Sequence, residues 1–529
     1  MRKVFRVFSL TFLALSISLS SCKPKTQDET ATDFNDFKFL EYSIEEMHQG
    51  FVDGDFTVEE VVQAYLDRIE ALDKNGPNLN SFICLNPDVL EDARALDKEL
   101  KEGKVRGPLH GIPVTLKDNI DAKGMPTTAG SRALENSYPL DDSFVAKKLR
   151  DAGAIILGKV SLSEWANFRG SLSSSGWGGV IGQTKNPYFL DRNPCGSSSG
   201  SGVAVSANLC MLSIGTETNG SIVCPSHANG VVGIKPTVGL ISRRGVVPIA
   251  STMDSPGPMG RSVADVAIGL GILAGVDIDD EKTSFAEGKI LTDYTSFLNI
   301  DGLKGKRIGF FTKPMGVHFK VDELMSKTIE LLKNEGVEII EIDEISIPET
   351  AASAFEVMLY EYKDGLNKYF ASLGPDAPIK NLEELIEFNK NDEIELEFYN
   401  QAYLEMAQAK GDLDSPEYKK ALAAMIKQSR EEGIDKIMDK HNLDAIVAPT
   451  GSPAWKTDWT NGDSYHIGSS SPSAQAGYPI ISLPMGVIED LPVGVSFFGR
   501  AWSEGVLIEI AYAFEQKTKQ RIVPKFIAN

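Results

Sequence analysis

The chain has 529 residues, of which 42% are hydrophobic and 24% are charged, the balance of a globular protein with a large core. This composition excludes a mostly disordered chain, a fibre and a multi-pass membrane protein. Asp and Glu number 74 against 53 Lys and Arg, so the net charge is −21, which argues against nucleic acid as a partner.

The N-terminus has the order of an export signal. Three basic residues within the first six precede an apolar stretch from Val7 to Leu19. This stretch is shorter than the ~20 residues that span a bilayer. Leu19-Ser20-Ser21-Cys22 then resembles the cleavage box of bacterial lipoproteins, which implies a signal peptide over residues 1–22 and acylation of Cys22. An ordinary signal peptide with a chance cysteine is the alternative.

Residues 23–40 are polar and show no periodic apolar pattern, which predicts a flexible tether. Acyl chains would hold the protein at a bacterial membrane, in the cell envelope, without spanning it. Removal of residues 1–22 lowers the net charge from −21 to −24. Disulfides can form after export. Sequence does not reveal pairing among the remaining cysteines, which we expect to be buried free thiols: Cys84, Cys195, Cys210 and Cys224.

Residues 41–529 are predicted to form one α/β domain. Ser43-x-x-Glu46 and Thr57-x-x-Glu60 are capping boxes that begin helices, and Pro416 begins another. Short apolar runs alternate with such helices and predict buried strands: Ile112–Leu116, Ala154–Leu157, Ala445–Ala448, Ile480–Leu483 and Val493–Phe498. This alternation predicts a mixed β-sheet. Residues from about 279 to 440 are more charged and predict a peripheral helical region of the same domain.

Ser and Gly crowd the chain between Ser171 and Ser221. Buried-looking apolar segments follow the run at 195–202 directly, which favours a functional site over a flexible linker. Gly196-x-Ser198-x-Gly200 also satisfies the nucleophile-elbow pattern, so an esterase with Ser198 as nucleophile and His441 or His466 as base is an alternative. A phosphate loop at 153–159 is rejected, because Val160 stands where Ser or Thr should hold the metal.

Several segments in order resemble the amidase signature family. They are the lysine segment at 111–119, the loop at 127–131, the Ser/Gly run at 195–201 and the segments at 215–222 and 491–500. The resemblance runs from about Ser43 to Phe514 and is nearest to bacterial peptide amidases at 163–169, 193–196 and 221–225. It implies a single large domain, with helices on both faces of the sheet. It also implies hydrolysis of a carboxamide, such as the C-terminal amide of a peptide, to acid and ammonia without a metal or other cofactor.

The same resemblance implies a Ser-Ser-Lys triad. Ser221 would be the nucleophile, Ser197 the bridging serine that follows a cis peptide bond, and Lys117 the base. The family also implies an oxyanion hole formed by the backbone N–H groups of Thr218, Asn219, Gly220 and Ser221. Substrate-binding or supporting roles are expected for Thr128, Gly196, Ser198 and Asp254. Cys195, Ser199, Asn219 and Val223 depart from the commoner family pattern, so substrates of other branches do not transfer directly.

The residue types suit amide hydrolysis. A Ser hydroxyl needs a base, and a Lys with an ordinary pKa of about 10.4 is protonated near neutrality. Lys117 ends an apolar run, so burial is expected to lower its pKa; pairing with Asp118 or Asp121 is the alternative. His110 and His227 are expected to be packed or hydrogen-bonded rather than catalytic. A solute-binding lipoprotein remains a non-enzymatic alternative, whereas export and acidity argue against a tRNA-amidating role.

Overall fold

The structure is a computed structural model that describes residues 34–345 and 347–528, and its compact unit begins at Phe37. The cleavage box, Cys22 and residues 23–33 of the predicted tether lie outside the described residues. Phe39 is buried, so the packed chain begins before residue 41, within the last residues predicted as tether. None of the helices in the described ranges has the length and apolarity that a membrane span requires.

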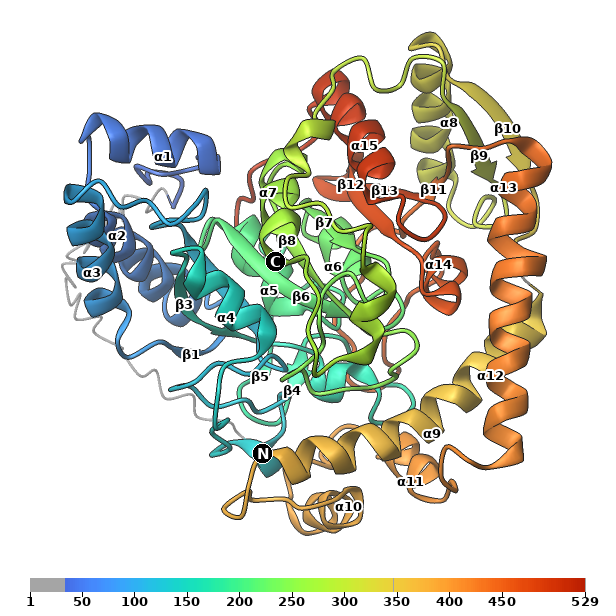
Figure 1. The fold of residues 1–529 in the computed structure, drawn as a ribbon, viewed down its shortest axis with the longest axis horizontal. Helices are drawn as coiled ribbons and strands as arrows, with labels where there is room; N and C mark the ends of the chain where they lie inside the picture. Colours follow the sequence, from blue (N-terminus) through green and yellow to red (C-terminus); the bar gives the residue numbers. More distant parts are fainter. Residues whose placement is uncertain (1–33, 346, 529) are drawn as a thin grey trace, which may run out of the picture. The chain divides into compact units, whose positions relative to one another are not determined.

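Within the described residues, eleven strands form one mixed sheet (Figure 1). From one edge to the other the strands are β1 (Phe82–Leu85), β3 (Ile155–Val160), β2 (Pro113–Lys117), β6 (Leu212–Glu217), β8 (Ser255–Gly260), β7 (Val232–Lys235), β12 (Ile480–Ile488), β13 (Leu491–Phe498), β11 (Ala445–Pro449), β9 (Arg307–Phe311) and β10 (Glu338–Ile342). All five predicted strands are confirmed as members of this sheet. The segment rejected as a phosphate loop is β3 and the turn before it.

The sheet contains two parallel groups of strands separated by an antiparallel stretch, and the edge strand β1 is antiparallel to β3. The β3, β2 and β6 strands are parallel to one another, and so are β11, β9 and β10. The strands between these two groups pair antiparallel, from β6 through β8, β7, β12 and β13 to β11. The small separate hairpin β4 (Trp177–Gly178) and β5 (Gly182–Gln183) lies in the Ser/Gly-rich stretch.

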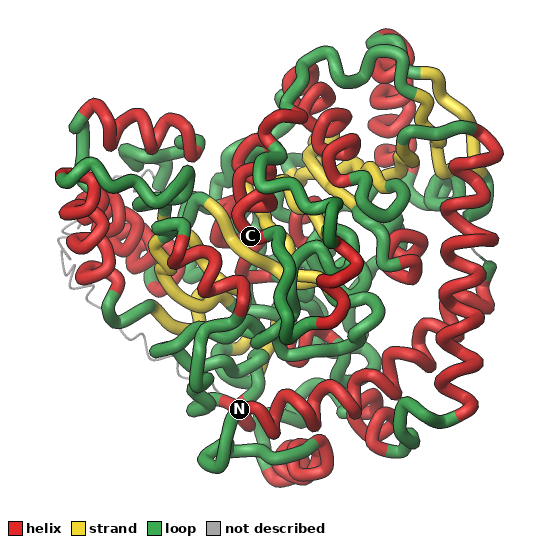
Figure 2. Tube along the Cα trace, in the orientation of Figure 1, coloured by secondary structure: helices red, strands yellow, loops and turns green. Residues whose placement is uncertain are grey.

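Helices cover the strands (Figure 2). They are α1 (Ile44–Asp53), α2 (Val58–Ile69), α3 (Val89–Lys101), α4 (Phe144–Asp151), α5 (Ser199–Ser206), α6 (Val223–Ala228), α7 (Val263–Leu273), α8 (Phe319–Asn334), α9 (Pro348–Ser372), α10 (Leu382–Asn391), α11 (Ala402–Gln408), α12 (Pro416–Ser429), α13 (Asp435–His441), α14 (Ser471–Ala476) and α15 (Glu504–Thr518). Both predicted capping boxes form: Ser43 and Thr57 each accept from the backbone N–H three residues on, and the Glu there accepts from the cap.

Residues of β6 show which helix covers which face of the sheet. A Cβ added to Gly269 of α7 would meet Leu212, whereas a Cβ added to Gly215 would lie 2.8 Å from Ser198 Oγ at the start of α5. Leu212 and Gly215 are an odd number of positions apart, so they point to opposite faces. The α5 and α7 helices therefore cover opposite faces of the central strands, as the predicted fold requires.

The peripheral region at about 279–440 is largely helical but also contributes two strands, β9 and β10, that were not predicted. Its long helices α9 and α12 pack side by side (Figure 1). Their apolar cluster extends to a short segment after β3: Phe168 lies edge-on to Tyr362 at 5.1 Å, and Trp165 to Phe370 at 6.3 Å. This region therefore supports residues 165–168, of which 166–168 line the candidate site.

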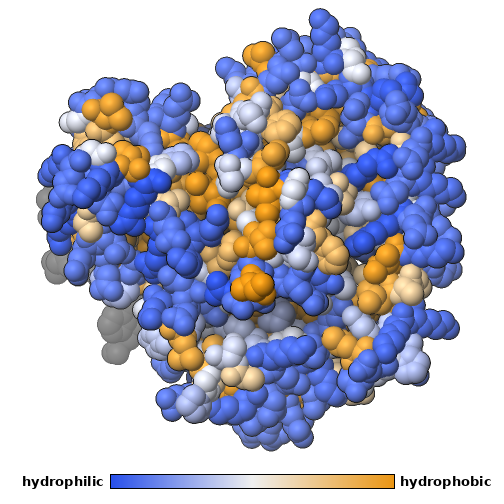
Figure 3. Space-filling view, viewed as in Figure 1, coloured by the Kyte–Doolittle hydropathy of each residue, from blue (hydrophilic) through white to orange (hydrophobic). Residues whose placement is uncertain are grey.

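The surface shown in Figure 3 is mostly hydrophilic, with separate hydrophobic areas. Such a surface agrees with the charged composition of the chain.

Candidate active site

Lys117 is the last residue of β2 and is fully buried. Its Nζ atom lies 2.7 Å from Ser197 Oγ, 2.9 Å from Thr216 Oγ1 and 3.1 Å from the Thr216 carbonyl oxygen. No carboxylate in the described part of the chain forms an ion pair with it, because Asp118 pairs with Lys159 and Asp121 accepts from Tyr369. Burial lowers the pKa of Lys117 to about 7, against the opposing charges of more distant carboxylates.

The three partners of Lys117 suit the neutral amine. A neutral amine has two N–H donors and one lone pair. The carbonyl and hydroxyl oxygens of Thr216 can accept the two N–H groups, and the Ser197 hydroxyl can donate to the lone pair. Lys117 is therefore placed to act as a base rather than as a fixed cation. Thr216, on the neighbouring strand β6, was not singled out from the sequence.

Ser197 and Ser221 each lie two residues before a buried helix, α5 and α6 respectively. The Gly196–Ser197 peptide bond is cis, as the family resemblance implies. The two segments meet through the backbone, where Ser198 N donates to Ser221 O at 3.1 Å. The Ser221 side chain forms no hydrogen bond within the described residues, and Ser221 lines a cavity. The structure thus shows a contact between Lys117 and Ser197, and it places the Ser221 backbone beside Ser198.

The loop from Thr218 to Ser221 has free backbone donors. None of its four N–H groups donates a hydrogen bond to another described residue. Gly220 has φ +86°, a left-handed conformation that favours glycine. The Asn219 side chain accepts from Ser470 Oγ at 2.7 Å and donates to Ser471 Oγ at 3.2 Å, at the start of α14. This tied loop can present its N–H groups to a developing oxyanion.

Glu217 supports the same loop and was missed in the sequence. It is 1% exposed, and its Oε2 accepts from the backbone N–H groups of Ile222 at 2.8 Å and Val223 at 3.0 Å. These groups belong to the first turn of α6, so one carboxylate closes the chain around Ser221. An acidic residue shortly before a helix start was the available signal, because carboxylates bind free N–H groups there.

Asp254 supports the loop from the other side. Thr218 Oγ1 donates to Asp254 Oδ1 at 2.6 Å, and Asp254 Oδ2 accepts from Ile249 N at 2.8 Å and Ala250 N at 2.9 Å. Burial raises its pKa to about 6, although these hydrogen bonds favour the charged form. Asp254 lies behind the cavity that Ser221 lines and is not one of the residues that line it.

Thr128 and Ser198 also lie behind the cavity. Thr128 binds Asp118 through both its backbone N–H and its hydroxyl, and Asp118 forms a fully buried ion pair with Lys159. Ser198 Oγ donates to the Thr216 carbonyl at 3.1 Å and accepts from Thr216 N at 3.2 Å. Of the four residues expected to bind substrate or give support, only Gly196 lines the main cavity.

The main cavity has a volume of about 520 Å³, within the usual range for small-molecule sites. One wall is the segment at 195–196 with the loop at 218–221. A second wall comes from residues 166–168 together with Met358 and Tyr403, and a third from Trp455, Asp463 and Tyr465. No motif recognised in the sequence predicted the residues of this third wall. Because these walls come from distant parts of the chain, only the fold assembles the cavity.

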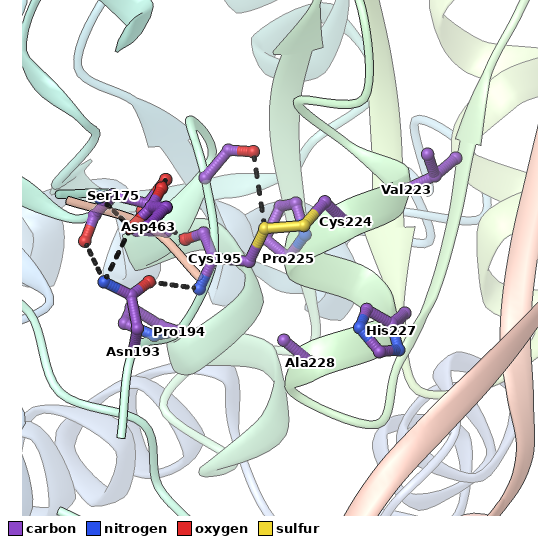
Figure 4. The surroundings of a disulfide bond; sticks show 12 residues. Ser175, Asn193, Pro194, Cys195, Val223, Cys224, Pro225, His227, Ala228 and Asp463 are labelled. Atoms are coloured by element: carbon purple, nitrogen blue, oxygen red, sulfur yellow. Dashed lines mark hydrogen bonds between the residues drawn. A yellow bond between two sulfur atoms is a disulfide. The ribbon is translucent and has the colours of Figure 1, made fainter. Parts of the chain in front are cut away.

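A disulfide bond joins Cys195 to Cys224 beside this cavity (Figure 4). The expectation that all four cysteines are buried free thiols is therefore wrong for this pair and confirmed for Cys210; Cys84 is a free thiol but only half-buried. The two half-cystines are 29 positions apart, and the contact between the starts of α5 and α6 brings them together. The bond joins the segment before Ser197 to the helix that follows Ser221.

The esterase alternative does not fit the geometry. Ser198 is fully buried, and its hydroxyl is held by Thr216. Within the described residues His466 bonds Ser464, and neither it nor His441 forms a hydrogen bond with Ser198. His110 and His227 are buried and hydrogen-bonded, as expected. In the ranges that the structure describes, no cluster of three or more His, Cys, Asp or Glu side chains is arranged to hold a metal ion.

Comparisons with known proteins identify the family of this chain. The model of the Amidase family matches residues 60–508. A protein of Arabidopsis thaliana named "Probable amidase" is 41% identical over 93% of this chain and 93% of its own length. A glutamyl-tRNA(Gln) amidotransferase subunit of Rippkaea orientalis is 34% identical over 90% of this chain and 98% of its own.

Solved structures are similar over nearly the whole chain. The peptide amidase PAM in complex with the competitive inhibitor chymostatin has a TM-score of 0.90 and 46% identity, and the match covers 92% of this chain and 100% of that one. The native peptide amidase from Stenotrophomonas maltophilia has a TM-score of 0.90 and 45% identity, with 93% and 99% covered. With a family model that spans most of its length and relatives of this similarity, the chain belongs to the amidase signature family, and it is a hydrolase that acts on amides.

Proposed function

We propose that the enzyme hydrolyses the C-terminal carboxamide of short peptides through an acyl-enzyme on Ser221. The observation that carries the proposal is the 2.7 Å contact between Lys117 Nζ and Ser197 Oγ, made by a fully buried lysine that has no carboxylate partner within the described residues. Its pKa of about 7 supplies a neutral base near physiological pH.

The proton would move in two steps. As Ser221 Oγ attacks the carbonyl carbon, its proton passes to Ser197 Oγ, while the Ser197 proton passes to Lys117 Nζ. A hydroxyl can carry out such a relay because it donates and accepts at once. The contact between the Ser197 and Ser221 hydroxyls is the part of this path that the proposal adds to the observed geometry.

Collapse of the tetrahedral intermediate would expel ammonia. The carbon–nitrogen bond breaks as the relay returns the proton from Lys117 to the leaving nitrogen, and the acyl group stays on Ser221. Water then attacks the acyl-enzyme, with the same relay taking its proton and returning one to Ser221. The unpaired N–H groups of the 218–221 loop would hold the oxyanion in both halves; losing one such donor typically costs about 3–4 kcal/mol of barrier.

A peptide substrate is supported by the cavity and by the relatives. The cavity combines aromatic side chains with backbone and amide groups, which suits a side chain plus a peptide unit. The solved relatives at 45–46% identity are peptide amidases. The tRNA-dependent relative is less similar, and the strongly acidic composition of this chain disfavours a tRNA partner.

We further propose that the protein is lipid-anchored in the bacterial cell envelope through Cys22. The order of basic, apolar and small residues before this cysteine supports an export signal. The Cys195–Cys224 disulfide suits an oxidising compartment. Cys22→Ala should move the protein from the membrane to the soluble fraction and abolish labelling by a radioactive fatty acid.

Ammonia release from a panel of amidated dipeptides and small amides tests the activity. We expect release from the peptide amides and none from Ser221→Ala. A fluorophosphonate probe should label the wild type at Ser221 and leave Ser221→Ala unlabelled. If no member of the panel releases ammonia but the probe still reacts, peptide amides are rejected as the substrate class, and the protein is still a serine hydrolase. Absence of both would reject the proposed mechanism.

A further inference from the structure

The charged lining of the main cavity is negative only. No Lys, Arg or His is among its lining residues in the described part of the chain. Asp463 is the one charged side chain that lines it. A ligand in this cavity therefore meets a carboxylate and no cation.

Neutral groups hold the Asp463 carboxylate in place. It accepts from Ser175 N at 2.9 Å, Ser175 Oγ at 2.5 Å and Trp455 Nε1 at 3.2 Å, and Asn193 Nδ2 lies 3.3 Å away. Figure 4 shows Asp463 beside Ser175 and Asn193. Burial raises the pKa of Asp463, whereas these hydrogen bonds lower it and favour the ionised carboxylate without cancelling its charge.

Three basic residues near the cavity form no ion pair with Asp463. Arg169 follows cavity-lining Phe168 but is 1% exposed, and its guanidinium lies 2.5 Å from Glu164 and 3.6 Å from Glu395. Lys456 follows Trp455 and forms an ion pair with Asp191. Lys117 lies behind Ser197 with a pKa of about 7. Asp463 is therefore the charged side chain that a ligand in this cavity meets directly.

Two aromatic rings stand next to this carboxylate. Trp455 and Tyr465 line the same wall, with ring centroids 6.0 Å apart. Aromatic faces attract ammonium and guanidinium groups and also cover the methylene stems of Lys and Arg. A carboxylate beside two rings is a suitable receptor for such a side chain or for a peptide α-ammonium group.

We infer that Asp463 determines specificity for the charge of the substrate, selecting peptide amides that carry a cationic group upstream of the scissile carboxamide and disfavouring those that carry a carboxylate there. This inference rests on the proposed function and deepens it. It assigns Asp463 to binding and not to the chemical step. The net charge of −21 acts in the same direction on the approach of the substrate.

The test uses N-acetyl-X-Leu-amides in which X is Lys, norleucine, Gln or Glu. Lys and norleucine have similar length and differ in charge, and so do Glu and Gln. We expect wild-type kcat/KM to be roughly fivefold to tenfold higher for Lys than for Glu, carried mainly by KM, and the ratio to shrink at high salt. Asp463→Asn should bring the four values close together.

Two variants control for side effects. Ser175→Ala removes a hydrogen bond to Asp463 but keeps its charge, so the Lys-to-Glu ratio should persist whatever happens to the absolute rate. Asp414→Asn removes the same charge from a side chain that is 92% exposed and outside the cavity lining, and should leave the ratio unchanged.

The outcomes are distinguishable. Equal ammonia release from all four amides by the wild type would overturn the inference and leave the proposed function intact. A preference that persists in Asp463→Asn would overturn the role of Asp463. No release from any amide would instead count against the proposed function.

Discussion

Asp118 forms a fully buried ion pair of 3.0 Å with Lys159, although its neighbour in the chain is Lys117. The sheet explains this choice. Register pairs Lys159 of β3 with Leu116 of β2, so these two side chains share a face, and Asp118 follows on that face two positions later. Lys117 points to the opposite face, where Ser197 lies. Strand alternation thus leaves Lys117 without a counterion, although a carboxylate follows it directly in the chain.

The first prediction concerns the pH dependence of activity. A base must be neutral to accept a proton, and the pKa of Lys117 is about 7. Below that pH, kcat/KM should fall about tenfold per pH unit, and above it the profile should be level until another group titrates. Ammonia release between pH 5 and pH 9 measures this. A profile that stays level down to pH 5, or that keeps rising to pH 9, would contradict a base with this pKa.

The second prediction contrasts Lys117 with Lys159, which are both fully buried. Lys117→Met should reduce kcat by at least about 10²-fold to 10⁴-fold, because the base is gone, with little loss of stability, because no ion pair is broken. Lys159→Met leaves the Asp118 carboxylate buried and unpaired, which should cost about 3–5 kcal/mol of unfolding free energy. Denaturant unfolding and ammonia release check both variants. Equal destabilisation by the two substitutions would refute the distinction.

The third prediction concerns Glu217. Glu217→Ala leaves the N–H groups of Ile222 and Val223 buried without their acceptor, which should cost about 2–3 kcal/mol of stability. Because the loop carries Ser221, kcat should fall more than KM rises. Glu217→Gln retains one carbonyl acceptor and is the conservative control; it should recover part of kcat. If Glu217→Ala lowers stability but leaves kcat unchanged, Glu217 does not position the nucleophile.

Much of the fold follows from local sequence. Apolar runs predicted β2, β3, β11, β12 and β13, and the two capping boxes predicted helix starts that the structure confirms. The strand β9 and the edge strand β10 were missed because they lie within a largely helical region and because β10 mixes acidic and apolar residues without regular alternation. Such a strand is stabilised by its neighbours in the sheet, which local patterns do not reveal.

Only those site residues that belong to sequence motifs could be predicted. Lys117, Ser197 and Ser221 were identified by family resemblance, and the contact between the first two is present. Glu217 binds backbone N–H groups only five and six residues further on, so its local signal was available but overlooked. Asp463 binds Ser175, 288 positions away, and spacing along the chain does not mark such a contact. The Cys195–Cys224 pair depends on the approach of α5 and α6, a tertiary contact that cysteine spacing could not reveal.

The last prediction concerns this disulfide. It closes a 29-residue separation, for which loop-closure entropy predicts about 3–4 kcal/mol of stabilisation. Cys195→Ala/Cys224→Ala, or the wild type kept in a reductant, should therefore unfold at a lower temperature or denaturant concentration. Cys84→Ala, which removes a free thiol, is the matched control and should keep its sensitivity to reductant. Because the bond also links the segment before Ser197 to the helix after Ser221, the double variant should have a lower kcat even under conditions in which it remains folded. Unchanged unfolding of the double variant would show that packing alone holds α5 and α6 together.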